Sequence, residues 1–336
     1  MTQTQTPSAM RALQVTRLSE VFEGCEIVTA PVPQPKTGEA LVRVRAAALG
    51  FPQLLMTSGG YQHKPDLPFI FGGDWAGEVV SNGEGANQAI GARVIGGGFT
   101  GAFAEYASMR VQALTPMPES ASFEEAAAFP SAYLTAHVSL VHAGHLQAGE
   151  WVLVLGAGGG VGLAAVDLAR SLGANIIAGA SSQAKRAAIK AYCPEAHVID
   201  SSASFKDQVR EISGGGVDVV YDPVGGSAFA DAFSSLNFAG RLLVIGFASG
   251  EIPTLSVNRA LIKHISVIGV RAGEYSRRFP KKRAETMRAI FDGWAQGKLH
   301  PHVDKVFALD QWRDAMERMT SRSLIGRVIV RPGEAA

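Results

Sequence analysis

Cysteine is almost missing from this sequence, because only Cys25 and Cys193 occur among its 336 residues. Two cysteines exclude a disulfide framework and a cysteine-rich zinc lobe, which both need more of them. The two thiols are expected to be reduced, and this expectation favours a cytoplasmic protein.

Net charge and long apolar runs are also scarce. Lys and Arg total 31 against 30 Asp and Glu, so the formal charge is +1, which predicts no nucleic-acid partner. The most apolar long window, residues 151–169, is interrupted by several glycines and by Asp167. Residues 1–9 lack the basic-then-apolar pattern of a signal peptide. The sequence therefore predicts neither a membrane span nor a secretory leader.

Glycine and apolar residues are abundant, with 38 glycines and 47% hydrophobic residues. A chain of this length and composition can bury a large core and favours two domains. Over about the first 115 residues, short strand-like runs alternate with Gly- and Pro-rich turns, which predicts a β-rich module. These runs cover residues 12–16, 41–48, 78–80, 92–95 and 102–107. A helix is expected from Ser122, a favourable N-cap residue.

Beyond that helix the pattern changes to alternating strands and helices, which predicts a parallel, doubly wound α/β sheet. The expected strands cover residues 152–155, 175–178, 197–199, 217–221, 241–245 and 264–270. The expected helices cover residues 161–172, 184–191, 205–212 and 228–236. A helix over 280–296 and a strand over 324–330 complete the chain.

The strongest local signal is a glycine turn between the strand at 152–155 and the following helix. Gly156, Gly159 and Gly162 recur at every third residue. In a dinucleotide-binding turn, such glycines allow the tight turn, the approach of a pyrophosphate and close helix packing. The amides of Gly160 and Val161, at the N-terminus of the following helix, then face the phosphates. The alternative is a glycine-rich turn without a ligand, which would not require this order of strand, turn, helix and strand.

The end of the second strand indicates which dinucleotide binds. NAD-binding sheets usually carry an acidic residue there, about 20 residues after the glycines. This chain has Ser181 and Ser182 instead, followed by Lys185 and Arg186. Hydroxyls and a cation suit the 2′-phosphate that distinguishes NADPH from NADH. The alternative is that both basic residues only form a solvated helix face.

With these motifs in place, the chain resembles the medium-chain dehydrogenase/reductase superfamily, and within it the zinc-independent quinone oxidoreductases, especially the quinone-oxidoreductase-like branch. The resemblance extends from about Met10 to Arg331. Besides the glycine turn it rests on residues 54–61, 101–106, 219–226, 246–253 and 325–328. It implies a GroES-like catalytic domain over residues 1–130 and 273–336, with a Rossmann NADPH-binding domain over 131–272.

The resemblance also implies roles for individual residues. Thr135 is expected beside the nicotinamide, with Gly246 and Phe247 lining the same end of the cofactor. Tyr61 is expected to face the substrate cleft, either as a proton donor or as a stacking ring. Ser181, Lys185 and Arg322 match positions that bind the 2′-phosphate. A homodimer is implied as well, because the strand near 264–270 often extends the sheet across a dimer in this family.

Departures from the family concern the substrate side. Zinc-dependent relatives carry Cys at Gly50 and Gly-His-Glu at Gly72, Gly73 and Asp74, so no zinc is expected here. Quinone oxidoreductases usually carry Asn at Gly50 and often Asp near Gln53, which implies a wider and less polar cleft around Gly50 in this chain.

The expected activity is hydride transfer from NADPH to a quinone or an activated conjugated double bond. Two alternatives stay open. One is an enoyl-thioester reductase whose acidic coenzyme A moiety would meet a basic run formed by Arg277, Arg278, Lys281, Lys282 and Arg283. The other is an NADPH-binding protein without turnover.

Overall fold

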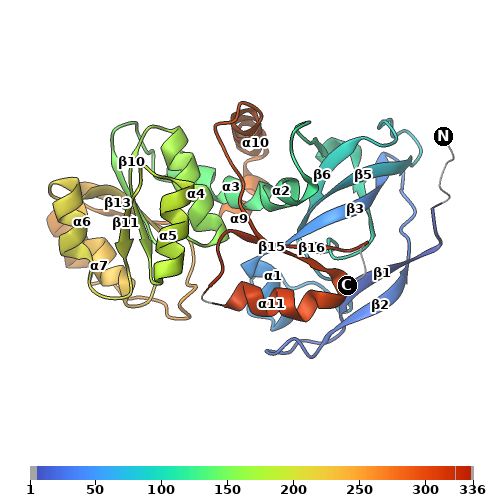
Figure 1. Ribbon diagram of the computed structural model, residues 1–336, viewed down its shortest axis with the longest axis horizontal. Coiled ribbons are helices and arrows are strands. Elements are labelled where there is room, and N and C mark those ends of the chain that lie inside the picture. Colours follow the sequence, from blue (N-terminus) through green and yellow to red (C-terminus); the bar gives the residue numbers. More distant parts are fainter. Residues whose placement is uncertain (1–5, 322, 334–336) are drawn as a thin grey trace. The chain divides into compact units, whose positions relative to one another are not determined.

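The computed structural model describes residues 6–321 and 323–333 and divides into two compact units (Figure 1). The first, here called the β unit, comprises the chain up to Pro130, Val303–Ser321 and the chain from Arg327 onward. The second, the Rossmann unit, comprises Ser131–His302 and Arg322–Gly326.

The second boundary differs from the expectation, which assigned residues 273–302 to the catalytic domain. The reason lies in contacts made by two helices, α9 (Ala272–Arg278) and α10 (Pro280–Ala295). Tyr275 of α9 stacks on His142 with 5.5 Å between ring centroids, and Thr286 of α10 hydrogen-bonds to the same histidine at 2.9 Å. His142 lies within the Rossmann unit, so both helices belong to that unit.

The β unit is rich in strands, as the short strand-like runs predict, and these strands form two sheets. One sheet has the order β2-β1-β4, and the other has the order β15-β16-β3-β5-β6-β8, with β7 paired to β3. All pairs are antiparallel except β15 with β16. The strands are β1 (Ala9–Val15), β2 (Cys25–Pro31), β3 (Glu39–Leu49), β4 (Phe69–Ile70), β5 (Asp74–Asn82), β6 (Arg93–Gly97), β7 (Tyr106–Arg110), β8 (Thr115–Pro116), β15 (Val303–Ala308) and β16 (Arg327–Arg331).

Several expected strands differ in extent from those observed, as two examples show. The run at 102–107 enters a strand only at Tyr106, and the final strand begins at Arg327 instead of residue 324. The unit also contains α1 (Phe51–Thr57), η1 (Val111–Ala113), α2 (Phe123–Ala128), η3 (Leu309–Gln311) and α11 (Trp312–Thr320). Ser122 is the N-cap of helix α2, as expected: the Ser122 side chain accepts from the Glu125 amide, while the Glu125 carboxylate accepts from the Ser122 amide.

The Rossmann unit is built on a parallel sheet with the order β11-β10-β9-β12-β13-β14. This is the strand order of the doubly wound dinucleotide-binding fold, and it confirms the predicted fold class. Its strands are β9 (Trp151–Val154), β10 (Asn175–Ala180), β11 (His197–Asp200), β12 (Val217–Asp222), β13 (Leu236–Val244) and β14 (Ser266–Gly269). Its other helices are α3 (Pro130–His137), η2 (Val138–Ala143), α4 (Gly160–Ser171), α5 (Gln183–Tyr192), α6 (Lys206–Ser213), α7 (Ala228–Ser234) and α8 (Val257–Lys263).

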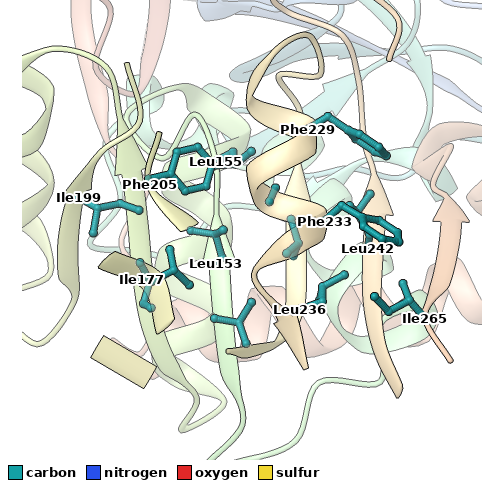
Figure 2. Packing of buried hydrophobic residues seen from close by; sticks show 14 residues of the cluster. Leu153, Leu155, Ile177, Ile199, Phe205, Phe229, Phe233, Leu236, Leu242 and Ile265 are labelled. Atoms are coloured by element: carbon teal, nitrogen blue, oxygen red, sulfur yellow. The ribbon is translucent and has the colours of Figure 1, made fainter. Parts of the chain in front are cut away.

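One hydrophobic cluster joins this sheet to α6 and α7 (Figure 2). Leu153 of β9, Ile177 of β10 and Leu242 of β13 are fully buried, and Phe233 of α7 packs in the same cluster. Burial of each such side chain contributes about 1.5–3 kcal/mol relative to exposure. The cluster therefore fixes the strand that carries the glycine turn.

The helices of both units are short or carry many polar residues. Within residues 6–321 and 323–333, no helix is both long enough and apolar enough to cross a bilayer.

Candidate functional site

The glycine turn connects β9 to α4 in the order expected from the sequence. Gly156 has a φ of +57°, a conformation that favours glycine, and Gly159 is the N-cap of α4. The first helical residues are Gly160 and Val161, so their amides lie at the open N-terminal end of a twelve-residue helix. This arrangement suits the binding of an anionic group.

Gly159 and Gly162 have different roles, as the space around each of them shows. A Cβ atom placed on Gly162 would overlap the carbonyl oxygen of Gly156, so this glycine allows close packing of helix and turn. A Cβ atom on Gly159 would meet nothing closer than the same oxygen at 3.4 Å. The protein therefore does not require glycine at position 159 for packing, and open space there is what an approaching pyrophosphate needs.

Ser182 and Lys185 lie together at the end of β10, beside the turn. The Ser182 hydroxyl caps α5 by accepting from the Lys185 amide at 3.3 Å, and Ser181 is exposed. The aliphatic part of Lys185 lies 3.1 Å from the position of a Cβ atom on Gly158. The fold thus brings the expected 2′-phosphate residues next to the expected pyrophosphate turn. Arg322, the third expected phosphate residue, lies outside the described residues.

An acidic residue of the neighbouring strand β11 lies near this position. Asp200, at the end of β11, pairs with Arg186 at 2.9 Å. Hydrogen bonds from Ser202 and the Arg186 charge lower the pKa of Asp200. Arg186 also donates to the Ala180 carbonyl at 3.2 Å. Arg186 is therefore held by contacts within the protein itself.

Gly246 and Phe247 follow β13 and lie against the loop after β12. A Cβ atom on Gly246 would lie 3.5 Å from the Pro223 carbonyl oxygen, and one on Gly225 would lie 2.9 Å from the Phe247 ring. Asp222 holds this loop by accepting from the amides of Val224 at 2.8 Å and Gly225 at 2.9 Å. Burial raises the pKa of Asp222, and these two amides oppose the rise. Asp222 thus acts in the structure as a loop anchor.

Thr135 belongs to the Rossmann unit and Tyr61 to the β unit. Thr135 lies on α3, where its hydroxyl donates to the Ser131 carbonyl at 2.7 Å. The hydroxyl oxygen therefore retains lone pairs for a further donor. Tyr61 is half-buried in the loop after α1 of the β unit.

Polar side chains lie close to Gly50 and Gly73. A Cβ atom on Gly50 would overlap Oε1 of Gln53, and one on Gly73 would lie 2.6 Å from Nε2 of the same side chain. Buried Arg327 lies alongside, with Nη1 3.6 Å from the Gly50 Cβ position. An amide and a cation thus lie beside the two glycines. The expectation of a wider and less polar cleft than in typical quinone oxidoreductases stays a prediction.

Arg327 is paired with Asp74, with 3.6 Å between Nη2 and Oδ2. Burial lowers the pKa of Arg327, and the Asp74 charge opposes this effect. Gly50 and Gly73 offer no ligand side chain for a metal. Among residues 6–321 and 323–333, no group of three His, Cys, Asp or Glu residues is arranged to hold a metal ion.

Two family models match the chain. The alcohol dehydrogenase GroES-like domain matches residues 36–119, and the zinc-binding dehydrogenase model matches residues 160–288. The quinone oxidoreductase-like protein 2 homolog of Nematostella vectensis is 35% identical over 299 residues, which are 88% of this chain and 82% of that protein.

Solved structures show the same likeness. The quinone oxidoreductase of Thermus thermophilus, also solved in complex with NADPH, is 30% identical with a TM-score of 0.84 and covers 96% of this chain and 100% of its own. The CurK enoyl reductase is 26% identical with a TM-score of 0.86 and covers 97% of this chain and 99% of its own. The chain therefore belongs to the quinone oxidoreductase-like family of the medium-chain dehydrogenase/reductase superfamily.

Proposed function

We propose that this protein is an NADPH-dependent reductase of quinones or other conjugated carbonyl acceptors. The observation that carries the proposal is the glycine turn of the Rossmann unit with Lys185 beside it and serines, instead of a carboxylate, after β10. The T. thermophilus relative was solved with NADPH, which supports the same cofactor here.

Each site residue has a defined task in this proposal. The amides of Gly160 and Val161 bind the pyrophosphate at the start of α4. Ser181, Ser182 and Lys185 hold the 2′-phosphate, with Arg322 as a further candidate. NADPH, when bound, supplies the hydride.

At the other end of the cofactor, Thr135, Gly246 and Phe247 orient the nicotinamide and exclude water from it. Tyr61 contacts the acceptor, either by donating a proton or by stacking on its ring.

The acceptor class follows from the residues around Gly50. Reduction of an isolated ketone places charge on one oxygen, which usually requires a metal or a strong acid partner. A quinone or an enone spreads that charge over a conjugated system. Hydrogen-bond donors such as Gln53 then suffice, and Gly50 and Gly73 need not supply metal ligands.

A second candidate is the reduction of a conjugated enoyl thioester, which the similarity to the CurK enoyl reductase favours. Part of the basic run is paired within the protein. Arg277 and Arg278 both pair with Glu274, at 2.7 Å and 2.6 Å, and lower its pKa to about 2. Lys282 pairs with Glu285 at 2.9 Å. Two carboxylates thus pair with three of the five cations, so the basic run keeps a net positive charge.

The test combines cofactor titration with an acceptor panel. NADPH and NADH are titrated by fluorescence, and initial rates are then measured with duroquinone, an α,β-unsaturated ketone and crotonyl-CoA. Tighter binding of NADPH and turnover of the first two acceptors support the proposal. A preference for crotonyl-CoA selects the second candidate. Tight NADPH binding without turnover of any acceptor identifies a binding protein instead.

We further propose that the protein forms a homodimer through β14. This strand is at the end of its sheet, so one of its edges has no neighbouring strand within the described chain. Exposed apolar side chains surround it: Phe238 is 74% exposed, Leu261 81%, Ile262 73% and Val267 41%. An open edge beside an apolar face fits a two-fold contact in which two copies of β14 pair.

The oligomeric state is tested by light scattering coupled to size exclusion. Leu261→Glu places a charge on the apolar face and is expected to shift the protein from dimer to monomer. Ile90→Glu is the control, because Ile90 is 64% exposed but lies in the β unit. A wild-type monomer, or equal behaviour of both variants, contradicts this interface.

A further inference from the structure

One amide in the β unit occupies the space left by two glycines. Gln53, in helix α1, places Oε1 where a Cβ atom of Gly50 would lie and Nε2 within 2.6 Å of a Cβ position on Gly73. Any larger residue at position 50 or 73 would displace this side chain. The position of the Gln53 amide thus depends on the absence of a side chain at both Gly50 and Gly73.

The side-chain amide of Gln53 is available for a ligand. Its backbone N–H donates to the Gly50 carbonyl at 3.1 Å, but in the described part of the chain its side chain makes no hydrogen bond. The side chain is half-buried, so it is not simply a solvated surface group. A half-buried amide whose NH₂ group and carbonyl oxygen make no hydrogen bond to the described residues is suited to bind a polar ligand atom.

The electrostatics beside the amide favour a ligand oxygen over a ligand donor. Arg327 is buried with its Nη1 3.6 Å from the Gly50 Cβ position, and it pairs with the Asp74 carboxylate at 3.6 Å, which is longer than a hydrogen bond. Arg327 Nη1 thus lies on the side of the amide occupied by Oε1, and its positive charge favours an oxygen ligand at this amide over a donor. The interactions of the amide and the guanidinium with a ligand oxygen become stronger as negative charge develops on that oxygen.

We infer that Gln53 is a specificity-determining residue that donates a hydrogen bond from Nε2 to the carbonyl oxygen of the acceptor. This inference rests on the proposed function and deepens it, because it assigns the group that recognises a carbonyl. Gly50 and Gly73 contribute by leaving room for the amide, and Arg327 contributes by its positive charge. An acceptor without a carbonyl or equivalent oxygen gains nothing from this arrangement.

The experiment compares Gln53→Leu, which keeps the volume but removes the donor, with Gln53→Glu, which replaces the donor by an acceptor. Gln88→Leu is the control, since Gln88 is also half-buried in the β unit and its side chain makes no hydrogen bond within residues 6–321 and 323–333. Loss of one such hydrogen bond is expected to lower kcat/KM for duroquinone about 10-fold or more. Glu is expected to lower it at least as far, and NADPH affinity is expected to stay within about twofold in every variant.

A binding measurement separates this inference from the proposed function. Duroquinone is titrated into the NADP⁺-loaded protein and followed by quenching of tryptophan fluorescence. Weaker duroquinone binding to Gln53→Leu with unchanged binding to Gln88→Leu supports the inference even if the wild-type protein shows no turnover, which would refute only the proposed function. Wild-type affinity and kcat/KM in Gln53→Leu overturn the inference while the function stands. Absence of duroquinone binding to the wild-type protein overturns both.

Discussion

The backbone amide of Gly326 donates a hydrogen bond to the carbonyl oxygen of Gly158 at 2.9 Å. Gly326 also forms a parallel bridge with Gly159, so a residue near the C-terminus supports the turn that opens α4. The chain leaves the Rossmann unit directly after Gly326. The conformation of the phosphate-binding turn therefore depends on a segment far away in the sequence.

Substitution of Gly326 is expected to weaken cofactor binding. Its φ is +83°, and a Cβ atom would lie 2.6 Å from the His302 carbonyl oxygen, so Gly326→Ala must shift this segment and its bond to Gly158. We expect the Kd for NADPH to rise about 10-fold, as for the loss of one backbone hydrogen bond. Gly297→Ala is the control, because Gly297 has a φ of +66° but a Cβ atom there meets nothing within 4 Å. Equal Kd values in the two variants would show that backbone strain alone is responsible.

Substitutions of Gly159 and Gly162 are expected to have different effects, on cofactor binding and on stability respectively. Gly162→Ala forces a methyl group against the Gly156 carbonyl, which should cost about 1–3 kcal/mol of stability and lower the Tm. Gly159→Val meets only an ordinary contact at 3.4 Å and should fold with a Tm near that of the wild type. Its branched side chain nevertheless fills the space needed by the pyrophosphate, so NADPH binding should be lost. Thermal unfolding and cofactor titration of both variants test this, and normal NADPH binding by folded Gly159→Val would disprove the assignment of that glycine.

Lys185 is expected to discriminate between the two nicotinamide cofactors. Lys185→Ala removes a charge that only the 2′-phosphate of NADPH can use, so its NADPH Kd should rise about 10- to 100-fold while the NADH Kd changes little. Arg186→Ala should have a smaller effect, because the Arg186 guanidinium is already paired with Asp200. Fluorescence titrations with both cofactors give the ratio. Equal losses for NADPH and NADH in Lys185→Ala would refute its role as a phosphate ligand.

His137 is expected to make stability depend on pH. Burial and the neighbouring His142 lower the pKa of His137 from 6.5 to about 4, and its buried Nδ1 makes no hydrogen bond within the described residues. Between pH 6.5 and 4, His137 is protonated in the unfolded chain but stays neutral in the folded protein. The free energy of unfolding therefore falls as the pH decreases through this window. At about pH 5 the loss is up to about 2 kcal/mol relative to about pH 7.5.

Urea unfolding at about pH 7.5 and about pH 5 measures this loss. His137→Phe removes the titrating group and should reduce the difference between the two pH values. His197→Phe, at an exposed histidine of the same unit, should leave the difference unchanged. An unaltered pH dependence in His137→Phe would show that other groups cause it.

Much of the Rossmann unit was predictable because its signals are local. The glycine turn lies between a buried strand and an apolar helix, and the Ser122 cap contacts Glu125 only three residues away. Strand and helix periodicity was sufficient for the doubly wound sheet, since each element follows the previous one in a regular order. The absence of an acidic residue after β10 likewise required no knowledge of tertiary contacts.

Other features were decided only by the tertiary structure. The sequence contains Gly50, Gln53 and Gly73, but only the packing of α1 against the start of β5 places the amide between the two glycines. Asp200 meets Arg186 because β11 is the neighbour of β10 in the sheet, and α9 and α10 join the Rossmann unit through His142. Such contacts join segments distant in the chain, and no local pattern of hydrophobicity, charge or turn residues encodes which distant segments will meet.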